Sequence, residues 1–152
     1  MSTRALFTVA LPDGSEFNHY QHSDGYPDSQ HGVLAHLADA LATPVRRAAV
    51  AKGLTAARKV DISDVPTAAD RERYADSAEE VSHGPDREYY ALLRDHQGDF
   101  PAMAAAGIIA TCDGDWGAQY TYRVDFTNET VTVSDGTDEG TETIAFADLK
   151  AV

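Results

Sequence analysis

The sequence predicts a single α+β domain, in which a β-hairpin and a helix come first, helices fill the middle, and an antiparallel β-meander ends the chain. Two observations carry this prediction. Apolar and polar residues alternate near both ends of the chain, whereas apolar residues recur at helical spacing between them. A chain of 152 residues is long enough for one core and short for two, so residues 1–152 are expected to form one domain.

A β-hairpin is expected first, with strands over residues 4–11 and 16–22. The segment Pro12–Ser15 reads Pro-Asp-Gly-Ser, in which proline fixes φ and glycine supplies a positive φ, so it predicts the turn between the two strands.

A helix is expected after the hairpin, because apolar residues recur at helical spacing at Val33, Leu34, Leu37, Ala38 and Leu41. Asp28 or Ser29 is expected to cap its first turn, and Thr43–Pro44 is expected to end it. One face of this helix should pack on the hairpin.

Residues 44–84 contain few large apolar side chains, so the sequence predicts a helical excursion from a core built by the two ends of the chain. Two or three alanine-rich helical pieces are expected there, broken at Gly53 and at Asp61–Pro66, and part of the segment could be mobile. Gly84–Pro85 is typical of a helix start, and Gly98 is expected to end that helix.

The C-terminal third predicts strands. A short alanine-rich turn from Pro101 should lead into a strand over Ile108–Cys112. The strongest alternation of apolar and polar residues covers Ala118–Phe126, which predicts a strand with one buried face. Strands over Thr130–Ser134 and Glu142–Phe146 complete the expected meander.

The net charge of −13 argues against nucleic acid as a partner, because affinity for a phosphate backbone depends on Lys and Arg. One stretch, residues 44–60, has five positive charges and no negative ones: Arg46, Arg47, Lys52, Arg58 and Lys59. It is interpreted as a solvated helix face that pairs with the acidic remainder. The alternative is a docking patch for an anionic partner, with Arg46 and Arg47 as interface candidates.

Cys112 is the only cysteine, so no internal disulfide can form, and a reducing, cytoplasmic location is expected. Its thiol is expected to be a small buried apolar group. The run Ala5–Leu11 is too short to span a membrane. Trp116 is expected either to complete the core or to form an exposed aromatic interface.

Residues 19–32, which read HYQHSDGYPDSQHG, hold the candidate reactive groups. His22, Asp24 and His31 are the only weak candidates for a metal site, and they could also serve a hydrolase. His19 and His22 are three apart on the expected strand and so point to opposite faces, which opposes chelation by that pair. His22, Asp24 and His31 could converge only across the loop. Neither a metal nor another cofactor is therefore predicted.

A tight turn is the preferred interpretation of the same residues. Asp24 would bond to the backbone two residues on, Gly25 would adopt an unusual φ, and Tyr26 would pack inward before Pro27. The isomer of the Tyr26–Pro27 bond stays open. If the turn also binds a ligand, the candidate residues are His22, Asp24, Tyr26, His31 and Gly32; the last two lie at an expected helix N-terminus that could hold an anion.

The segment from Tyr20 to Leu37 resembles a signature of small uncharacterised proteins from bacteriophages and prophage-bearing bacteria. In that signature a strand ends in aromatic-x-His-x-Asp-Gly-Tyr-Pro, a His-Gly or Gly pair follows, and a Leu-rich helix comes next. The matching residues are Tyr20, His22, Asp24, Gly25, Tyr26, Pro27, His31, Gly32, Leu34 and Leu37. Ser23 departs from the signature, since an aromatic residue is frequent there. A vaguer likeness covers Tyr120–Val133.

The resemblance implies a small accessory protein of a virus or mobile element that acts on a host component. The expected function is binding of a host protein or a small ligand, and the strong acidity favours basic partners. A His/Asp-dependent hydrolase, with or without a metal, is the alternative. A structural or assembly component is a further alternative, for which a homo-oligomer would be expected.

Overall fold

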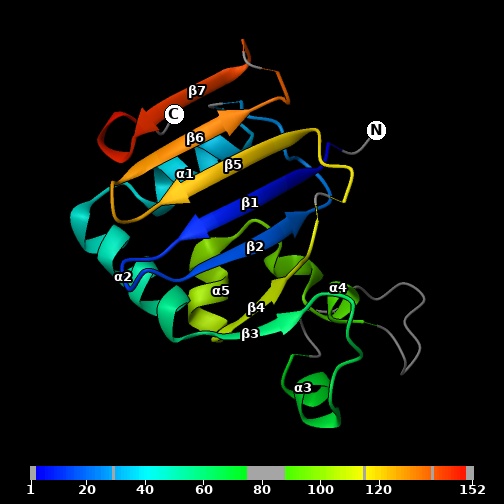
Figure 1. Ribbon diagram of the computed structural model, residues 1–152. Coiled ribbons are helices and arrows are strands. Elements are labelled where there is room, and N and C mark those ends of the chain that lie inside the picture. The colour runs from blue at the N-terminus through cyan, green and yellow to red at the C-terminus, as the bar shows by residue number, and fades with distance from the viewer. Residues whose placement is uncertain (1–2, 29, 75–87, 115, 138, 150–152) are drawn as a thin grey trace.

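A computed structural model describes residues 3–28, 30–74, 88–114, 116–137 and 139–149. Its centre is a five-stranded sheet of order β2-β1-β5-β6-β7. The strands are β1 (Ala5–Ala10), β2 (Glu16–Gln21), β5 (Tyr120–Asp125), β6 (Thr130–Ser134) and β7 (Thr141–Ala145). Helices cover one face of the sheet and leave the other open (Figure 1). The mixed α/β character of the prediction is confirmed. The N-terminal hairpin and the C-terminal meander agree with it in part, because the strand expected at Ile108–Cys112 lies in a separate sheet.

The order of the strands adds one pairing that the sequence did not predict. β1 runs parallel to β5, whereas the pairs β1–β2, β5–β6 and β6–β7 are antiparallel. The N-terminal hairpin and the C-terminal meander are thereby joined into one mixed sheet.

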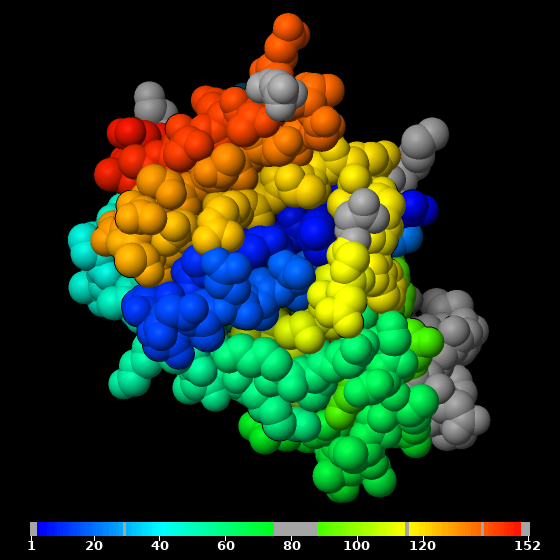
Figure 2. Space-filling model, viewed as in Figure 1, coloured from blue at the N-terminus to red at the C-terminus, as the bar shows by residue number. Residues whose placement is uncertain are grey.

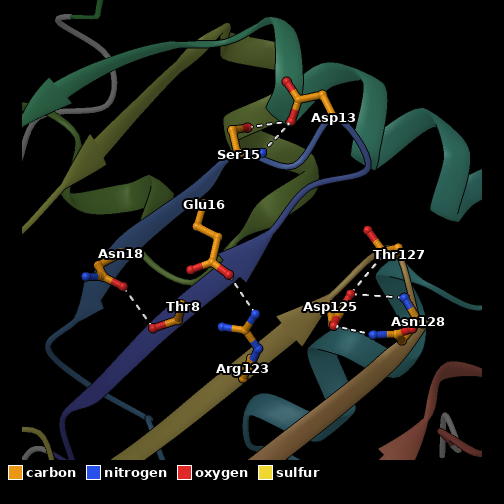
Figure 3. A network of polar contacts seen from close by, with 9 residues as sticks. All are labelled: Thr8, Asp13, Ser15, Glu16, Asn18, Arg123, Asp125, Thr127 and Asn128. Atoms are coloured by element: carbon orange, nitrogen blue, oxygen red, sulfur yellow. Dashed lines mark hydrogen bonds and ion pairs between the residues drawn. The ribbon is translucent and has the colours of Figure 1, made fainter.

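The hairpin turn forms for the reason that its sequence indicates. The Asp13 carboxylate accepts hydrogen bonds from the backbone N–H and the hydroxyl of Ser15, at 2.9 and 2.6 Å (Figure 3). Gly14 has a φ of +88°, which glycine adopts without strain. Leu11 N–H then donates to the Ser15 carbonyl and closes the turn.

The open face of the sheet is polar, and its side chains bond to one another. Thr8 bonds to Asn18 at 2.8 Å, and Arg123 forms a 2.6 Å ion pair with Glu16 on β2 (Figure 3). At the β5–β6 turn, Asp125 accepts hydrogen bonds from residues 127 and 128. A sheet with antiparallel pairs can leave one face to water when its polar groups are satisfied in this way.

The helix-covered face holds the main core. Phe7 stacks on Tyr122 with 5.2 Å between ring centroids, and it contacts Phe100 edge-on at the same distance. Leu37 of α1 (Val33–Ala40) and Leu54 of α2 (Pro44–Ala56) are also fully buried here. The two ends of the chain and α2, which lies in the middle of the sequence, therefore build this core together.

α2 corrects the prediction that the middle of the chain is an excursion broken at Gly53. The helix runs through Gly53 without interruption and begins at Thr43, whose hydroxyl accepts the N–H of Arg46. A Cβ at position 53 would lie 2.4 Å from the Cβ of Ala104. Glycine is used because α2 contacts α5 (Phe100–Ala106) closely, and this tertiary contact outweighs its low helix propensity.

The cap prediction for α1 is also wrong. Its N-cap is Gly32, without a side-chain cap bond, and the Asp28 carboxylate accepts the N–H of Gln30 in the preceding turn instead. Ser29 lies outside the described residues. Thr43, expected only to end this helix, caps the next one.

A second, two-stranded sheet pairs β3 (Arg58–Asp61) in parallel with β4 (Ile108–Thr111). β4 was predicted, whereas β3 was predicted as helix or break. β4 lies beside β2 (Figure 1), and Cys112 N–H donates to the Asn18 carbonyl at 3.1 Å. Cys112 is buried as expected, and burial raises the pKa of its thiol to about 11.

The remaining described elements are short. They are α3 (Ala68–Arg73), α4 (Tyr89–Leu92) and the 3-10 helices η2 (Arg94–His96) and η3 (Phe146–Asp148). The predicted helix start at Gly84–Pro85 lies outside the described residues, and the expected single helix up to Gly98 is divided into α4 and η2. No helix in the described ranges is long and apolar enough to cross a membrane.

Candidate functional site

The signature segment begins with a turn that is fixed between two strands. Gly25 N–H donates to the Thr3 carbonyl at 2.8 Å, and the Gly25 carbonyl accepts the buried Tyr122 hydroxyl at 2.6 Å. A Cβ on Gly25 would lie 2.7 Å from the Cβ of Ala5. Asp24, just before it, has a φ of +59°. Glycine is needed at position 25 because the backbone there lies close to Thr3 and Ala5. The unusual φ predicted for Gly25 is found at Asp24 instead.

A second close approach leads the chain into α1. The Tyr26 carbonyl accepts the N–H of Val33 at 2.9 Å, and Gly32 N–H donates to the Asp28 carbonyl at 3.0 Å. A Cβ on Gly32 would lie 2.3 Å from the Tyr26 oxygen. The Tyr26–Pro27 bond is trans. The structure therefore uses Gly32 for packing at this turn.

His22 is held by its neighbours. Its backbone N–H donates to Oε1 of Gln97 at 2.9 Å, and its Nδ1 lies 3.0 Å from the Tyr20 hydroxyl. Its ring also contacts Tyr90 edge-on, with 6.3 Å between centroids. These contacts join the end of β2 to the segment after α4.

The three residues weighed for a metal site are not gathered into one metal-binding group. His31 is exposed in the turn before α1, whereas His22 is partly buried against Tyr20. Within the part of the chain that the structure describes, no three His, Cys, Asp or Glu side chains lie close enough to hold a metal ion. His22 and His19 use ring nitrogens in contacts within the protein: His22 with the Tyr20 hydroxyl, and His19 with the backbone of Ala110 and Gly98.

A cavity of about 300 Å³ lies beside the turn. Its walls come from the end of β2, from the turn, from α1 and from the segment around η2: Gln21, Ser23, Asp24, His36, Arg94, Asp95, Gln97, Gly98 and Asp99. A smaller cavity of about 190 Å³ shares His36, Gly98 and Asp99 with it. Three carboxylates and one arginine line the larger cavity, so its walls are net acidic.

Asp24 is the signature residue whose carboxylate lines this cavity without a partner among the described residues. Its carboxylate makes no hydrogen bond or ion pair with any described residue, which corrects the expectation that it bonds to the backbone two residues on. Arg94, in contrast, donates to the Tyr90 hydroxyl at 2.7 Å and lies over the Tyr90 ring. Asp99 accepts the N–H of Ala102.

Gln97 contributes a second unused group. Its Oε1 accepts the backbone N–H of His22, and its buried Nε2 has no hydrogen-bond partner among the described residues. A buried donor without a partner costs about 1–3 kcal/mol, so this group requires an explanation. Gln97 could not be found from the sequence, because it belongs to no motif and lies 75 residues from His22.

His19 was overlooked as a structural residue. Its Nδ1–H donates to the Ala110 carbonyl at 2.9 Å, and its Nε2 accepts the N–H of Gly98 at 3.0 Å. Burial lowers the pKa of this histidine to about 4, which keeps the ring neutral at physiological pH. His19 therefore joins both sheets to the wall of the cavity.

Trp116 lies at the rim of an aromatic cluster with Tyr20 and Tyr90. Its ring is 38% exposed and lies 5.2 Å from the ring of Tyr20 and 6.5 Å from that of Tyr90. The residue thus meets parts of both expectations, since it packs on the buried Tyr20 and the partly buried Tyr90 and also reaches the surface.

The arginines weighed as a docking patch make intramolecular contacts. Arg46 pairs with Asp39 at 3.3 Å, and Arg47 pairs with Glu129 at the same distance. Arg47 also donates to the Leu41 carbonyl at 2.7 Å. This geometry favours the solvated, paired helix face over the patch for an anionic partner.

A wider groove of about 450 Å³ lies between the two sheets, on the face that Figure 2 shows. It is lined by Glu16, Phe17, Asn18, Lys59, Thr111, Cys112 and Asp113. Lys59 is already bonded to the carbonyls of Leu54 and Thr55. None of the signature residues reaches this groove.

Comparison with protein-family models, with curated proteins and with solved structures finds no match to this chain. The function is therefore argued from its own residues.

Proposed function

We propose that the protein is a binding protein whose ligand is a small polar molecule with a cationic group, held in the 300 Å³ cavity beside the signature turn. The observation that carries the proposal is the unpaired carboxylate of Asp24 on the wall of that cavity. The signature glycines have structural roles, whereas the charge of Asp24 has none inside the protein.

The charge of the walls favours a cation. The carboxylates of Asp24 and Asp95 form no hydrogen bond or ion pair with described residues, and Asp99 keeps its charge while it caps α5. The guanidinium of Arg94 donates to the Tyr90 hydroxyl and keeps its charge, but the three carboxylates of the lining outnumber it. Ammonium and guanidinium groups form their strongest hydrogen bonds with carboxylates.

The size of the cavity favours a ligand of roughly amino-acid or polyamine size. Ligand cavities of about 300–1,000 Å³ enclose small molecules, and this cavity is at the lower end of that range. Gln97 adds an amide donor that could bind a carbonyl or carboxylate of the same ligand. An accessory role in a virus or mobile element is part of the proposal and rests only on the sequence resemblance.

The test is binding of argininamide and spermidine, measured by calorimetry and by amide chemical shifts. The variant Asp24→Asn removes the charge and keeps a residue type that tolerates positive φ, so the turn should survive. We expect it to weaken binding about five- to tenfold. The control Asp64→Asn makes the same charge change at an exposed carboxylate away from the cavity and should leave affinity unchanged.

The outcomes separate the alternatives. Shifts confined to residues 21–24, 36 and 94–99 would support the proposal. Equal losses in both variants would mean that the cation binds the acidic surface in general, and no shift at these residues with either probe would exclude a cationic ligand at this site.

A further inference from the structure

β7 is the outer strand of the five-stranded sheet, at the edge opposite the N-terminal hairpin (Figure 1). Five residues of β7 pair with β6, with Thr143 opposite Thr132 at the centre. The outer side of the strand is uncovered in the space-filling view (Figure 2).

The backbone register shows which groups of β7 point outward. Asp135 N–H donates to the Gly140 carbonyl, and Phe146 N–H donates to the Glu129 carbonyl. Because hydrogen-bonded pairs alternate along an antiparallel ladder, Glu142 and Ile144 also bond toward β6. The N–H and C=O groups of Thr141 and Thr143 and the N–H of Ala145 therefore point away from the sheet, and no backbone group of the described residues bonds to them. The Ala145 carbonyl is directed into η3, of which Ala145 is the N-cap.

The side chains around this edge are acidic. Asp135, Glu139, Glu142 and Asp148 are all exposed, and the sequence from residue 134 to 149 contains no Lys or Arg. A second copy paired antiparallel on β7 would bring the acidic ends 139–142 and 148 of the two chains together. That arrangement repels, so self-pairing is disfavoured and a basic strand is favoured.

We propose that the outer edge of β7 binds an extended, basic segment of another protein, which adds to the sheet as a sixth strand. Its backbone would bond to Thr141, Thr143 and Ala145. On the helix-covered face of the sheet, two side chains of the bound segment would lie beside Glu142 and Ile144. We therefore expect the segment to have one basic and one apolar residue two positions apart. This site is separate from the cavity beside Asp24 and does not depend on it.

The experiment uses a fluorescent peptide, acetyl-Lys-Thr-Lys-Thr-Val-Thr-Lys-amide, with polarisation for affinity and amide chemical shifts for location. The variant Thr143→Pro removes one outward N–H and no bond to β6, and proline is tolerated on the outer side of an edge strand. We expect it to weaken binding about tenfold or more. The matched variant Thr143→Ala keeps the N–H and should bind within about twofold of the parent.

The charge is tested separately. A peptide with Glu in place of each Lys should not bind, and Glu142→Gln combined with Asp148→Asn should weaken binding of the basic peptide and flatten its salt dependence. If Thr143→Pro fails to fold, the parent protein is tested instead with a modified peptide. This peptide has the same sequence but is N-methylated at the residues whose N–H groups face β7, and it should not bind.

Four results would overturn the proposal. The basic peptide could bind Thr143→Pro as well as the parent, its shifts could fall outside residues 139–148, or the acidic peptide could bind equally well. A concentration-dependent dimer that Thr143→Pro dissociates would assign the edge to a second copy and would equally overturn a basic partner.

Discussion

Single residues in this protein make long-range connections that determine how the site is built. His19 is the strongest case, because one buried imidazole bonds to a carbonyl of β4 and to the N–H of Gly98. Both bonds use the neutral ring with its proton on Nδ1. Protonation would place a second proton on Nε2, which must accept from Gly98, and would also bury a charge.

The first prediction follows from the pKa of His19, which burial lowers from 6.5 to about 4. Between these values the unfolded chain binds a proton that the folded chain does not, so stability is complete above about pH 6.5 and is lost as pH falls toward 4. The loss amounts to about 3 kcal/mol at most. Urea unfolding at several pH values between about 7 and 4.5 measures it.

The control for this prediction is a pair of histidine variants. His19→Gln should lower stability at neutral pH and flatten the pH dependence, whereas His36→Gln, at an exposed position, should leave the pH dependence as it is. An equally steep decline in His19→Gln would assign the effect to other groups. Asp70 and Asp125 also contribute to the pH dependence of stability, since both have lowered pKa values. Their contribution is lost at a more acidic pH than that of His19, so the two effects can be separated.

At the same scale, the sequence could predict only part of the candidate site. Asp24 was recognisable, because it stands in a polar turn before a helix. Gln97 and Arg94 were not, since nothing local distinguishes them and they reach the turn only through the packing of η2 against β2. The signature glycines were predicted as turn residues, but the atoms that they approach, in Ala5 and Tyr26, depend on the tertiary fold.

At the scale of elements, local rules worked where one element decided its own structure. The Pro-Asp-Gly-Ser turn and the alternation in β5 are examples, because turn chemistry and the two faces of a strand are written in a few consecutive residues. β3 was missed because all four of its side chains are exposed or only partly buried, so the segment shows no apolar period. It is a strand because β4 pairs with it.

α2 shows how a tertiary contact overrides propensity, and it gives the second prediction. Gly53→Ala should gain about 1 kcal/mol of helix propensity and lose more to the clash with Ala104, whose Cβ lies 2.4 Å from the new atom. We expect a net loss of about 1–2 kcal/mol in the free energy of unfolding, measured by urea titration.

A compensating substitution makes this prediction specific. Ala104→Gly removes the methyl group that the new Cβ would meet, so the double variant should be more stable than the sum of the two single changes implies. Strict additivity would mean that α2 and α5 are not in the close contact described. A stabilised Gly53→Ala would point to the same conclusion.

At the scale of the whole molecule, charge dominates. The chain has a net charge of −13, and several acidic residues lie at the open edge beside β7, while most of the basic residues of the 44–60 stretch are used in internal contacts. Such a distribution disfavours electrostatic attraction to a phosphate backbone. It also opposes the compact state by self-repulsion.

The third prediction is that salt stabilises the fold. Raising sodium chloride from about 20 to about 300 mM shortens the screening length and should raise the thermal midpoint at neutral pH by about 3 °C, because repulsion among carboxylates is reduced more than the exposed ion pairs are weakened. Calorimetry at constant buffer composition measures the shift. The variant Asp64→Lys reduces the excess negative charge at an exposed site and should raise the midpoint at low salt while it decreases the salt effect. A midpoint that falls with added salt would mean that ion pairs such as Arg58–Asp70, with 2.6 Å between charged atoms, outweigh the net repulsion.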